Sequence, residues 1–575
     1  MKKAIVLALA PLLIGVLWFH RYHFFYLLSE HVFSPPSRIP FAEHQNDRMK
    51  LFYPKNGGLA GRMQEIDGEI KQNMAAAEKQ IGIRFRGPLK VFLYNNWEEK
   101  GNQIKDIRVA SVKDGALHCI VNEDFDGLRE GLHYKILLEQ RYGPAGVSEW
   151  SDYSASALAG VWNQKSLDDW AQFLSVRDLQ PQFSYFSKED TGASEYLLHP
   201  WNALLARFIH ETYGWDAFVR LYKDGKTPSG YQQSWNQSLA AWKSAAATPA
   251  KQFQPQFQKG MTYAYTNSYD SGYATKKSKQ SLSDLKQIGV QWIAAVPYGF
   301  MRDHDSPRIF SAGHNIFTES DESMVALAQY AEESGLKIMV KPQIWIDHES
   351  WPGRVQFDQE SGWREWFNNY EKWILHYAIL SELINADLFC IGTELVQATI
   401  NHPDRWRQLI SRIRKVYHGP LVYAANYGRE FEQIEFWDAL DYIGLDNYYP
   451  VRSSLRDGEA EIRSAFQKQK ALLKSIATRY DKPLIFTEVG YMANEGAGMG
   501  SQENQFKKYD ETMQALCYTL ALESYWGEPW FYGMYWWKWF SDPGDSGKEA
   551  DRHSPRGRPA ELIVKHWYLR SRGGS

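Results

Sequence analysis

ADLFCIGTELVQ, residues 386–397, and KPLIFTEVGY, residues 482–491, are the two stretches that decide the fold. In each, an unbroken apolar run leads within a few residues to a glutamate, Glu394 in the first and Glu488 in the second. Such runs are typical of parallel strands that are covered on both faces. Burying a carboxylate at the end of a strand costs free energy unless the group has a partner or a functional role. Two endings of this kind indicate one shared site.

The sequence around these two stretches alternates strand-like runs with helical patterns. Apolar residues recur at helical spacing between the runs, as at Leu409, Ile413 and Val416. Eight such units predict an α/β fold, a (β/α)8 TIM barrel over residues 258–570, with its chemistry at the C-terminal ends of the strands. Glu394 and Glu488 would then end strands four and seven. The expected strands are Met261–Tyr265, Trp292–Pro297, Lys337–Trp345, Leu388–Glu394, Leu421–Asn426, Tyr442–Tyr448, Leu484–Glu488 and Tyr532–Trp537.

The composition narrows the class of ligand. The 575 residues include 23 Trp and 34 Tyr, and sugar rings stack on aromatic faces, although a large aromatic core would have the same composition. The formal net charge of −3 gives no indication of nucleic-acid binding. Cys119, Cys390 and Cys517 lie too far apart to suggest a disulfide framework or a zinc cluster. We therefore expect a carbohydrate ligand, no metal and no other cofactor.

Two carboxylates that face one cleft suit glycosidic bond cleavage. In a retaining mechanism they lie roughly 5–5.5 Å apart, one attacking the anomeric carbon while the other protonates the leaving oxygen. The attacking glutamate needs hydrogen bonds that keep it ionised, and Tyr448 is the expected donor. The alternative reading is that Glu394 and Glu488 are caps or ion-pair partners at the barrel rim.

Further residues at strand ends are candidates for substrate binding. The tryptophans could stack on sugar rings, or they could serve packing alone. Because side chains alternate along a strand, only one of Trp536 and Trp537 can face the cleft squarely. The candidate substrate-binding set is Lys341, Trp345, Asn426, Asn447, Tyr448, Trp536 and Trp537.

Residues 1–29 form a separate unit that predicts membrane targeting. Lys2 and Lys3 precede an uncharged run from Ala4 to Phe19, which ends in bulky residues rather than in the small residues of a cleavage site. We therefore expect an uncleaved signal anchor, with the body of the protein exported. The alternative is a cleaved signal peptide and a secreted or periplasmic protein.

Residues 30–250 predict a smaller α+β domain. Strands are expected at Pro88–Tyr94 and Ala116–Val121, and a helix at Leu128–Tyr142. Near the start of that helix stands Arg129-Glu130-Gly131-Leu132-His133, which resembles the H-E-x-x-H motif of zinc peptidases except that arginine replaces the first histidine.

The surrounding sequence resembles a gluzincin peptidase domain over roughly residues 85–225. The resemblance implies a third ligand at Glu149, but arginine cannot coordinate a cation, so a degenerate pseudo-peptidase domain is expected. Glu130 would then have no metal-bound water to activate and would pair with a neighbouring cation. The other reading is that Arg129, Glu130 and His133 only decorate a solvated helix face.

The barrel segment resembles glycoside hydrolase family 113 of clan A. The resemblance rests on KIMVKPQIW (337–345), FCIGTEL (389–395), YIGLDNYYP (442–450), LIFTEVGY (484–491) and YWWKW (535–539). It implies that Glu394 is the acid/base, that Glu488 is the nucleophile, and that β-1,4-mannan is the substrate. Thr393 departs from the clan, many members of which have asparagine there.

The sequence therefore predicts a retaining glycoside hydrolase, tethered to a membrane through its N-terminal segment, that cleaves a β-mannan-like polysaccharide or another cell-surface glycan by double displacement. The alternative is a non-catalytic, membrane-tethered protein that binds carbohydrate or assists assembly. The pair of carboxylates favours the enzyme, because a binding protein needs only aromatic faces and hydroxyl partners. Partners are expected to be a poly- or oligosaccharide and the membrane; the sequence identifies no protein partner.

Overall fold

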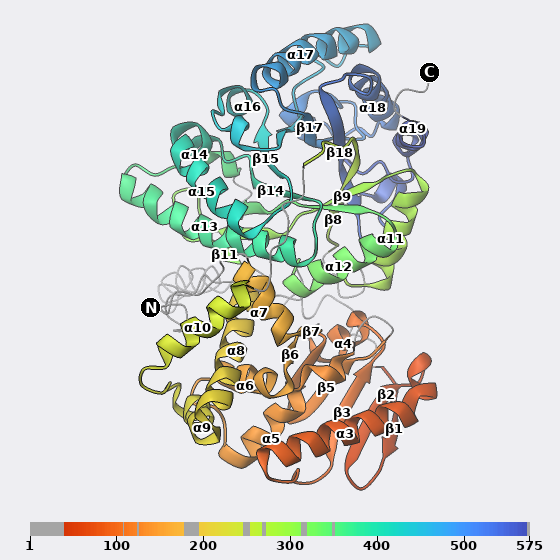
Figure 1. The fold of residues 1–575 in the computed structure, drawn as a ribbon. Coiled ribbons are helices and arrows are strands. Elements are labelled where there is room, and N and C mark those ends of the chain that lie inside the picture. Colours follow the sequence, from red (N-terminus) through yellow and green to blue (C-terminus); the bar gives the residue numbers. More distant parts are fainter. Residues whose placement is uncertain are drawn as a thin grey trace, which may run out of the picture.

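The computed structural model describes residues 39–571, apart from 107, 123–125, 177–194, 245–252, 267–271, 312–318 and 348–350. These residues form an N-terminal domain and a barrel, which lie one below the other in Figure 1. The predicted membrane-targeting segment, residues 1–29, lies outside the described residues. Among the described helices, none is both long and apolar enough to cross a bilayer.

The N-terminal domain is built on a five-stranded sheet with the order β1-β2-β3-β5-β4. β2, β3 and β5 run parallel, whereas β1 and β4 pair antiparallel at the two edges. The predicted strands of this domain are present as β3 and β5. The strands are β1 (Phe41–Gln45), β2 (Met49–Pro54), β3 (Leu89–Tyr94), β4 (Ala110–Lys113) and β5 (Ala116–Ile120), and the helices are α3 (Met63–Ile81), α4 (Trp97–Ile104), α5 (Leu132–Tyr142), α6 (Glu149–Ala159), α7 (Leu167–Val176), α8 (Glu195–Tyr213), α9 (Trp215–Asp224) and α10 (Tyr231–Ser244).

The helix predicted from Leu128 begins later, as α5 at Leu132. The preceding residues form a 3-10 turn, Gly127–Glu130, which is followed by Gly131 with a φ of 73°. A left-handed residue interrupts an α-helix, and glycine adopts this conformation without steric cost. A Cβ atom on Gly131 would also lie 2.1 Å from the Cβ of Ala159 on α6. The close packing of α6 therefore also requires glycine at the start of α5.

The second body is a closed barrel of parallel strands with helices outside it (Figure 1). All eight predicted strands are present. In chain order the barrel strands are β8 (Gln258–Ala264), β9 (Trp292–Ala295), β12 (Lys337–Val340), β14 (Leu388–Thr393), β15 (Leu421–Asn426), β16 (Tyr442–Asp446), β17 (Leu484–Val489) and β18 (Phe531–Phe540). The helices are α11 (Lys276–Gln287), α12 (Asp321–Glu333), α13 (Glu360–Leu383), α14 (Val396–Asn401), α15 (Pro403–Val416), α16 (Arg429–Gln433), α17 (Glu459–Tyr480), α18 (Glu511–Tyr525) and α19 (Pro559–Tyr568).

The third barrel strand is shorter than predicted. The expected strand Lys337–Trp345 divides into β12, which ends at Val340, and β13 (Gln343–Ile346). Pro342 lies between them, and proline cannot donate a backbone hydrogen bond to a ladder. β13 joins β10 (Tyr298–Met301) and β11 (Phe310–Ser311) in a small separate sheet. The chain after β12 therefore leaves the barrel wall.

The barrel closes between its first and last strands. β18 pairs in parallel with β8, with Tyr535 opposite Gly260. The helix α19 stabilises this seam, because the hydroxyl of Tyr568 donates to the carbonyl oxygens of Gly260 and Met534, each at 3.1 Å. Lys259 next to the seam donates to the carbonyl oxygen of Tyr568 at 2.5 Å.

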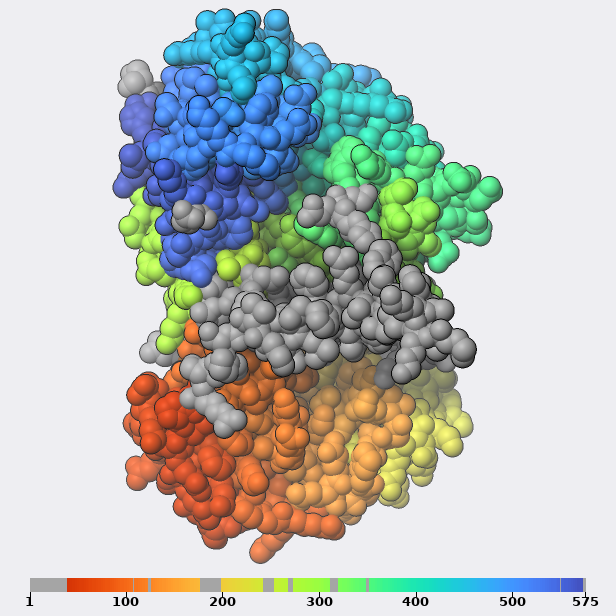
Figure 2. Space-filling view, turned by 180° about the vertical axis from the view of Figure 1, so that it is seen from behind, coloured from red at the N-terminus to blue at the C-terminus, as the bar shows by residue number. Residues whose placement is uncertain are grey.

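The two bodies meet through an apolar cluster. Ala274 and Ala326 of the barrel pack in one buried cluster with residues of the N-terminal domain that include Tyr94 and Trp97. Figure 2 shows the N-terminal domain in red to yellow below the green-to-blue barrel. Burial of aromatic and alanine side chains at the contact stabilises one arrangement of the two bodies.

Candidate active site

Glu394 and Glu488 belong to two barrel strands, β14 and β17, that are separated in the wall by β15 and β16. Glu394 directly follows β14, the fourth barrel strand, and has a φ of 53°. Its backbone N–H donates to the carbonyl oxygen of Ala424 on β15 at 2.9 Å, which fixes the turn. Glu488 lies within β17, the seventh strand, and is only 6% exposed. Both glutamates therefore lie at the C-terminal ends of the strands, as the sequence predicts.

Three donors surround the carboxylate of Glu488. Tyr448 donates its hydroxyl to Oε2 at 3.0 Å. Oε1 accepts a hydrogen bond of 2.7 Å from the side-chain amide of Gln343 on β13 and a short contact from Lys341. Donors to a carboxylate favour its charged form. Glu488 is therefore held in one orientation by these donors.

The prediction that Tyr448 donates a hydrogen bond to Glu488 is thus confirmed. The environment of Lys341 differs from the one predicted. Lys341 was expected to donate to sugar hydroxyls, but it has no exposed surface and lies beneath the glutamate. Gln343 was not among the predicted residues. It stands two residues after Lys341, and this i, i+2 spacing was the available signal.

A second buried carboxylate, Asp446 on β16, lies beside Lys341. Its Oδ2 is 3.4 Å from the Lys341 ammonium, and its Oδ1 accepts the hydroxyl of Thr487 at 2.7 Å. Burial and the charge of Glu488 raise the pKa of Asp446 well above its usual range. Burial alone would lower the pKa of Lys341, but Asp446 and Glu488 raise it above the ordinary value. Lys341 therefore stays charged in the barrel interior.

Glu394 has a different environment from Glu488. Its Oε2 accepts the indole N–H of Trp351 at 2.6 Å. Burial, and then the nearby charge of Glu488, raise the pKa of Glu394 to about 7, while the hydrogen bond from Trp351 opposes this shift. A carboxyl group with this pKa can hold a proton near neutral pH and release it in a reaction. Trp351 was not among the predicted residues.

Glu430, on α16, supports the segment that follows Glu394. It accepts hydrogen bonds from the hydroxyls of Thr399 at 2.8 Å and Tyr423 at 2.7 Å. Tyr423 in turn lies 2.8 Å from the backbone N–H of Leu395, which donates to it. Burial raises the pKa of Glu430 to about 7. Glu430 thus acts on the position of Glu394 through its neighbours.

Two of the predicted substrate-binding side chains are turned away from the site. Asn447 exchanges hydrogen bonds of 3.1 and 3.3 Å with Gln469 on α17. Trp536 is fully buried and stacks on Tyr518 of α18 with ring centroids 3.9 Å apart. Because side chains alternate along a strand, Trp537 points to the opposite side from Trp536. Asn447 and Trp536 are therefore not available to a substrate.

The remaining candidates lie nearer to solvent. Trp537 and Asn426 are both partly exposed. The side-chain amide of Asn426 donates to the carbonyl oxygen of Tyr427 at 3.0 Å. Trp345 is 46% exposed and makes an edge contact with Tyr298, with ring centroids 6.0 Å apart. Trp345 and Trp537 are the candidates that offer an accessible ring.

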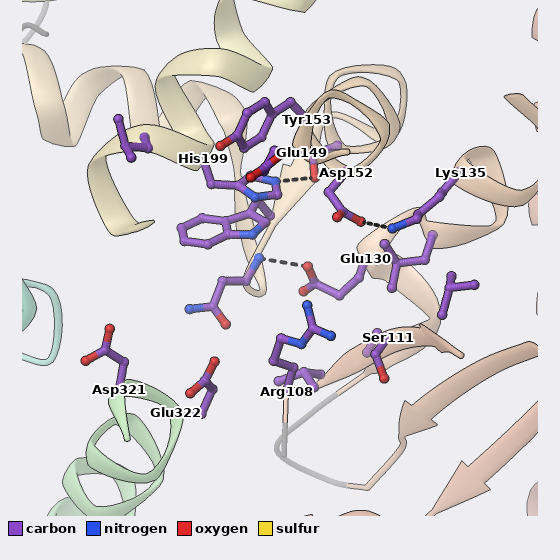
Figure 3. A pocket seen from close by; sticks show the side chains of 18 residues that line it. Arg108, Ser111, Glu130, Lys135, Glu149, Asp152, Tyr153, His199, Asp321 and Glu322 are labelled. Carbon is purple, nitrogen blue, oxygen red and sulfur yellow. Dashed lines mark hydrogen bonds and ion pairs between the residues drawn. The ribbon is translucent and has the colours of Figure 1, made fainter. Parts of the chain in front are cut away.

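The N-terminal domain contains a hollow of about 430 Å³. Figure 3 shows the side chains that line it. The edge strand β4 and the helices α5, α6 and α8 line it, and the start of α12 in the barrel closes one side. Lys135 and Asp152 form an ion pair across 2.8 Å within it. His199 is buried and contacts the hydroxyl of Ser156 at 2.9 Å, while burial lowers its pKa to about 3.

The structure separates the residues of the peptidase-like motif. Arg129 is 74% exposed and pairs with Asp126 at 3.0 Å. The prediction that Glu130 pairs with a cation is wrong, because its carboxylate accepts the backbone N–H groups of Asn163 and Gln164 at 2.7 and 2.6 Å. His133 is 7% exposed, and burial lowers its pKa to about 4.

Glu130 and His133 thus do not decorate a solvated face, and Glu130 holds the turn between β6 (Val161–Trp162) and β7 (Lys165–Ser166). Glu149, the expected third ligand, accepts the hydroxyl of Ser148 at 2.6 Å. Over the described part of the chain, no group of three or more His, Cys, Asp and Glu side chains is arranged to hold a metal ion.

The sequence model of Glycoside Hydrolase Family 113 matches residues 261–554. The chain belongs to this family. The family 113 chain is therefore a glycoside hydrolase, and its substrate is a carbohydrate. A search among curated proteins found no significant match.

Several solved structures resemble this family 113 chain. A structure described as a complex of a GH113 beta-1,4-mannanase is 27% identical, covers 55% of this chain and 100% of that chain, and has a TM-score of 0.49. The GH113 beta-mannanase AaManA from Alicyclobacillus acidocaldarius is 28% identical over 54% of this chain and 97% of that chain, also with a TM-score of 0.49. A β-glucuronidase from Ruminococcus gnavus is 13% identical over 55% of this chain and 50% of that chain, with a TM-score of 0.40.

Proposed function

We propose that this glycoside hydrolase is a retaining enzyme that cleaves a β-1,4-mannan-like polysaccharide, with Glu488 as nucleophile and Glu394 as acid/base. The observation that carries the proposal is the contrast between the two carboxyl groups. Glu488 is surrounded by the donors Lys341, Gln343 and Tyr448, whereas Glu394 has a pKa raised to about 7. Carboxyl groups whose environments differ in this way are suited to separate nucleophilic and acid roles.

In the first step, the Glu488 carboxylate attacks the anomeric carbon of the substrate. The glycosidic C–O bond breaks, and the proton of Glu394 passes to the leaving oxygen. The product is a glycosyl ester on Glu488, with the configuration at the anomeric carbon inverted. Loss of the charge on Glu488 leaves Lys341 facing Asp446, so that the buried ammonium still has a carboxylate beside it.

In the second step, water replaces the leaving group. Glu394, now ionised, takes a proton from this water while the oxygen attacks the anomeric carbon. The ester bond to Glu488 breaks, and the second inversion restores the original configuration. The raised pKa of Glu394 serves both steps, because the group is a proton donor in one and an acceptor in the other.

The type of sugar is proposed from the solved family 113 structures, which are described as β-1,4-mannanase and β-mannanase. In this chain Trp537 and Trp345 offer accessible ring faces on which a pyranose can stack. A planar aromatic face suits any sugar ring, so these residues support a carbohydrate rather than mannose in particular.

The test uses the full-length protein in detergent with a panel of β-1,4-mannan, β-1,4-xylan and β-1,4-glucan. Proton NMR of the first product formed should show the β anomer before mutarotation. Release of the α anomer would exclude a retaining mechanism, and hydrolysis of xylan or glucan but not of mannan would replace the proposed substrate.

The location of the enzyme is also part of the proposal. Lys2 and Lys3 before an uncharged run of sixteen residues, Ala4 to Phe19, support an uncleaved anchor and an exported catalytic barrel. The protein should fractionate with membranes and keep its N-terminus. Mass-spectrometric detection of a mature N-terminus near residues 20–35 would show that the segment is cleaved.

For the N-terminal domain, we propose a gluzincin-like fold without peptidase chemistry. The mixed sheet with an antiparallel edge strand, β4, beside a polar hollow supports such a fold. Arg129 faces solvent from a 3-10 turn instead of facing the hollow from a helix, and Glu130 is bound to backbone N–H groups. Neither residue is positioned to bind a metal or activate water.

A further inference from the structure

The polar hollow of the N-terminal domain is built by both bodies of the protein. Its volume of about 430 Å³ is within the range of roughly 300–1,000 Å³ that is usual for small-molecule sites. β4, α5, α6 and α8 belong to the N-terminal domain, whereas Asp321 and Glu322 begin α12 of the barrel. In Figure 3 these two side chains extend from the start of α12 toward those of the N-terminal domain. A ligand in the hollow would therefore contact both bodies.

The hollow lies at the catalytic end of the barrel. In a (β/α)8 barrel each helix begins near the C-terminal end of the preceding barrel strand, which is the end that carries the chemistry. The helix α12 follows the barrel strand β9, and its first residues, Asp321 and Glu322, close one side of the hollow. Most of the other lining residues precede residue 261, where the match to the family 113 model begins. The hollow is therefore a neighbour of the catalytic cleft rather than part of it.

Two buried polar atoms in the walls of the hollow have no hydrogen-bond partner among the described residues. They are the hydroxyl oxygen of Ser111 on β4 and Oδ2 of Asp321, and both residues are only 2% exposed. The other carboxyl oxygen of Asp321 contacts His376 at 2.8 Å. The great majority of buried polar groups in proteins are paired. Since an ionised carboxylate can only accept, a ligand that pairs with Asp321 must donate.

The charges of the hollow disfavour an acidic ligand. Five carboxyl groups and two cations line it: Glu130, Glu149, Asp152, Asp321 and Glu322, against Arg108 and Lys135. Both cations already have a carboxylate partner. Lys135 pairs with Asp152 at 2.8 Å. Arg108 pairs with Asp106 at 2.7 Å. An anionic ligand would therefore meet an excess of like charge.

Aromatic rings form another part of the wall. Trp162 on β6 and Tyr153 on α6 line the hollow, and both are partly exposed. His199 positions the two rings, because it stacks on Trp162 with centroids 4.5 Å apart and meets Tyr153 edge-on at 5.0 Å. A wall that is formed in advance loses less conformational entropy when a ligand binds. Rings beside carboxylates suit a pyranose, which stacks through its face and donates through its hydroxyls.

We propose that this hollow is a second carbohydrate-binding site, which holds a neutral oligosaccharide segment of the polysaccharide that the barrel cleaves. Trp162 and Tyr153 contact the sugar rings, and the sugar hydroxyls donate to Asp321 and Glu322. No bond forms or breaks in the hollow. A polymer held there has a raised effective concentration at the catalytic cleft, because its second binding event is intramolecular. This role rests on the proposed polysaccharide substrate, but the hollow and the cleft can be tested separately.

The first test compares a polymer, which can occupy the hollow and the cleft together, with a small substrate that cannot. The full-length protein in detergent is assayed on β-1,4-mannan and on an aryl β-mannobioside. Trp162→Ala and Glu322→Ala should each lower the ratio of kcat/KM for mannan to kcat/KM for the aryl substrate by about tenfold. Glu332→Ala, at an exposed position of the same helix α12, is the matched control and should leave the ratio unchanged.

The second test counts saccharide sites directly. Full-length Glu488→Ala, which should not hydrolyse its ligand, is titrated with β-1,4-mannohexaose in a calorimeter. We expect two sites, and one site after Trp162→Ala is added. Oligogalacturonate, an acidic saccharide, should not compete for the site that Trp162→Ala removes.

The outcomes separate the inference from the proposed function. An unchanged ratio in both hollow variants, with a single saccharide site in Glu488→Ala, would overturn the inference while mannan hydrolysis still supports the proposed function. An oligolysine peptide that binds in place of the saccharide, and is lost in Trp162→Ala, would assign the hollow to a basic peptide instead. If the wild type hydrolyses no mannan, the proposed substrate fails and the titration alone decides the inference. Because the ratio is taken within one variant, a partial loss of folded protein does not alter it.

Discussion

The Lys341 ammonium lies 3.4 Å from the Asp446 carboxylate, and neither side chain has any exposed surface. Lys341 also contacts Glu488, so one buried cation serves two carboxylates. Coulomb interactions are strong where water is excluded, and a buried charge without a partner is strongly destabilising. This arrangement links the stability of the barrel to the orientation of Glu488.

Lys341→Met should affect both stability and activity. Removing the cation leaves Asp446 and Glu488 buried together, and the loss of one partner from a buried pair costs roughly 3–5 kcal/mol. We also expect kcat to fall by about a hundredfold or more, because Glu488 loses a donor. Circular dichroism melting and steady-state kinetics measure the two effects.

The double variant Lys341→Met/Asp446→Asn separates the effect on stability from the effect on kcat. It removes one of the two buried carboxylates, so it should regain part of the lost stability without regaining kcat. Recovery of wild-type kcat in the double variant would show that Lys341 does not act on Glu488.

Replacement of the two glutamates should have different consequences. Glu488→Ala should abolish turnover, and azide should partly restore it by attacking the anomeric carbon to give a glycosyl azide of inverted configuration. Glu394→Ala should retain the first step for substrates with good leaving groups, which need no proton. Wild-type activity of both variants on polysaccharide would contradict these roles.

The pH dependence of kcat/KM should report the ionisation of Glu394. Its pKa is raised to about 7, so kcat/KM should fall as the pH rises through this value and the proton is lost. The hydrogen bond from Trp351 stabilises the ionised form of Glu394. Trp351→Phe should therefore move the alkaline limb of the kcat/KM profile to higher pH. A shift to lower pH would show that this bond does not stabilise the carboxylate.

The same pKa predicts a cost in stability. Between its ordinary pKa of 4.5 and about 7, Glu394 is protonated in the folded chain and ionised in the unfolded chain. The folded state then binds more protons, so the free energy of unfolding decreases as the pH rises through this window. Glu394→Gln removes the ionisation and should be more stable than the wild type at pH 8, by on the order of a few kcal/mol. Urea unfolding at pH 5 and pH 8 tests this, and an equal difference at both values would contradict it.

Restoring the missing histidine should not create a zinc site. Arg129 lies in a 3-10 turn before Gly131 and faces solvent, so Arg129→His would not place an imidazole one helical turn before His133. We expect Arg129→His and the wild type to retain no zinc after dialysis. Stoichiometric zinc in the variant, with chelator-sensitive peptidase activity, would show that the turn rearranges into a helix.

The barrel could be predicted because each strand is a short apolar run with a clear end. The positions of Glu394, Glu488 and Tyr448 followed from the same signal, since chemistry in this fold lies at strand ends. For adjacent residues of one strand, the direction in which each side chain points was harder to predict. Trp536 faces α18 and Trp537 the other side, and the period of two does not reveal which of the adjacent pair points inward.

The residues that were missed reach the site from loops and from other strands. Trp351 and Gln343 follow a strand that leaves the barrel at Pro342, and loop paths are not encoded in apolar periodicity. Asp446 looks like any polar residue at a strand end until Lys341 is placed beside it. In the N-terminal domain, the apolar spacing of the predicted helix continues through Gly131. The left-handed φ of 73° at Gly131 nevertheless delays the start of the helix to Leu132.

The seam between β8 and β18 has a consequence for how the chain is made. β8 is the first barrel strand to leave the ribosome and β18 is the last, with more than 260 residues between the end of one and the start of the other. At roughly 5–20 residues per second, β8 waits on the order of half a minute for its neighbour. The N-terminal domain is complete before β8 emerges and can fold first. Its contact with Ala274 and Ala326 then offers the nascent barrel a folded surface on which its first helices can assemble.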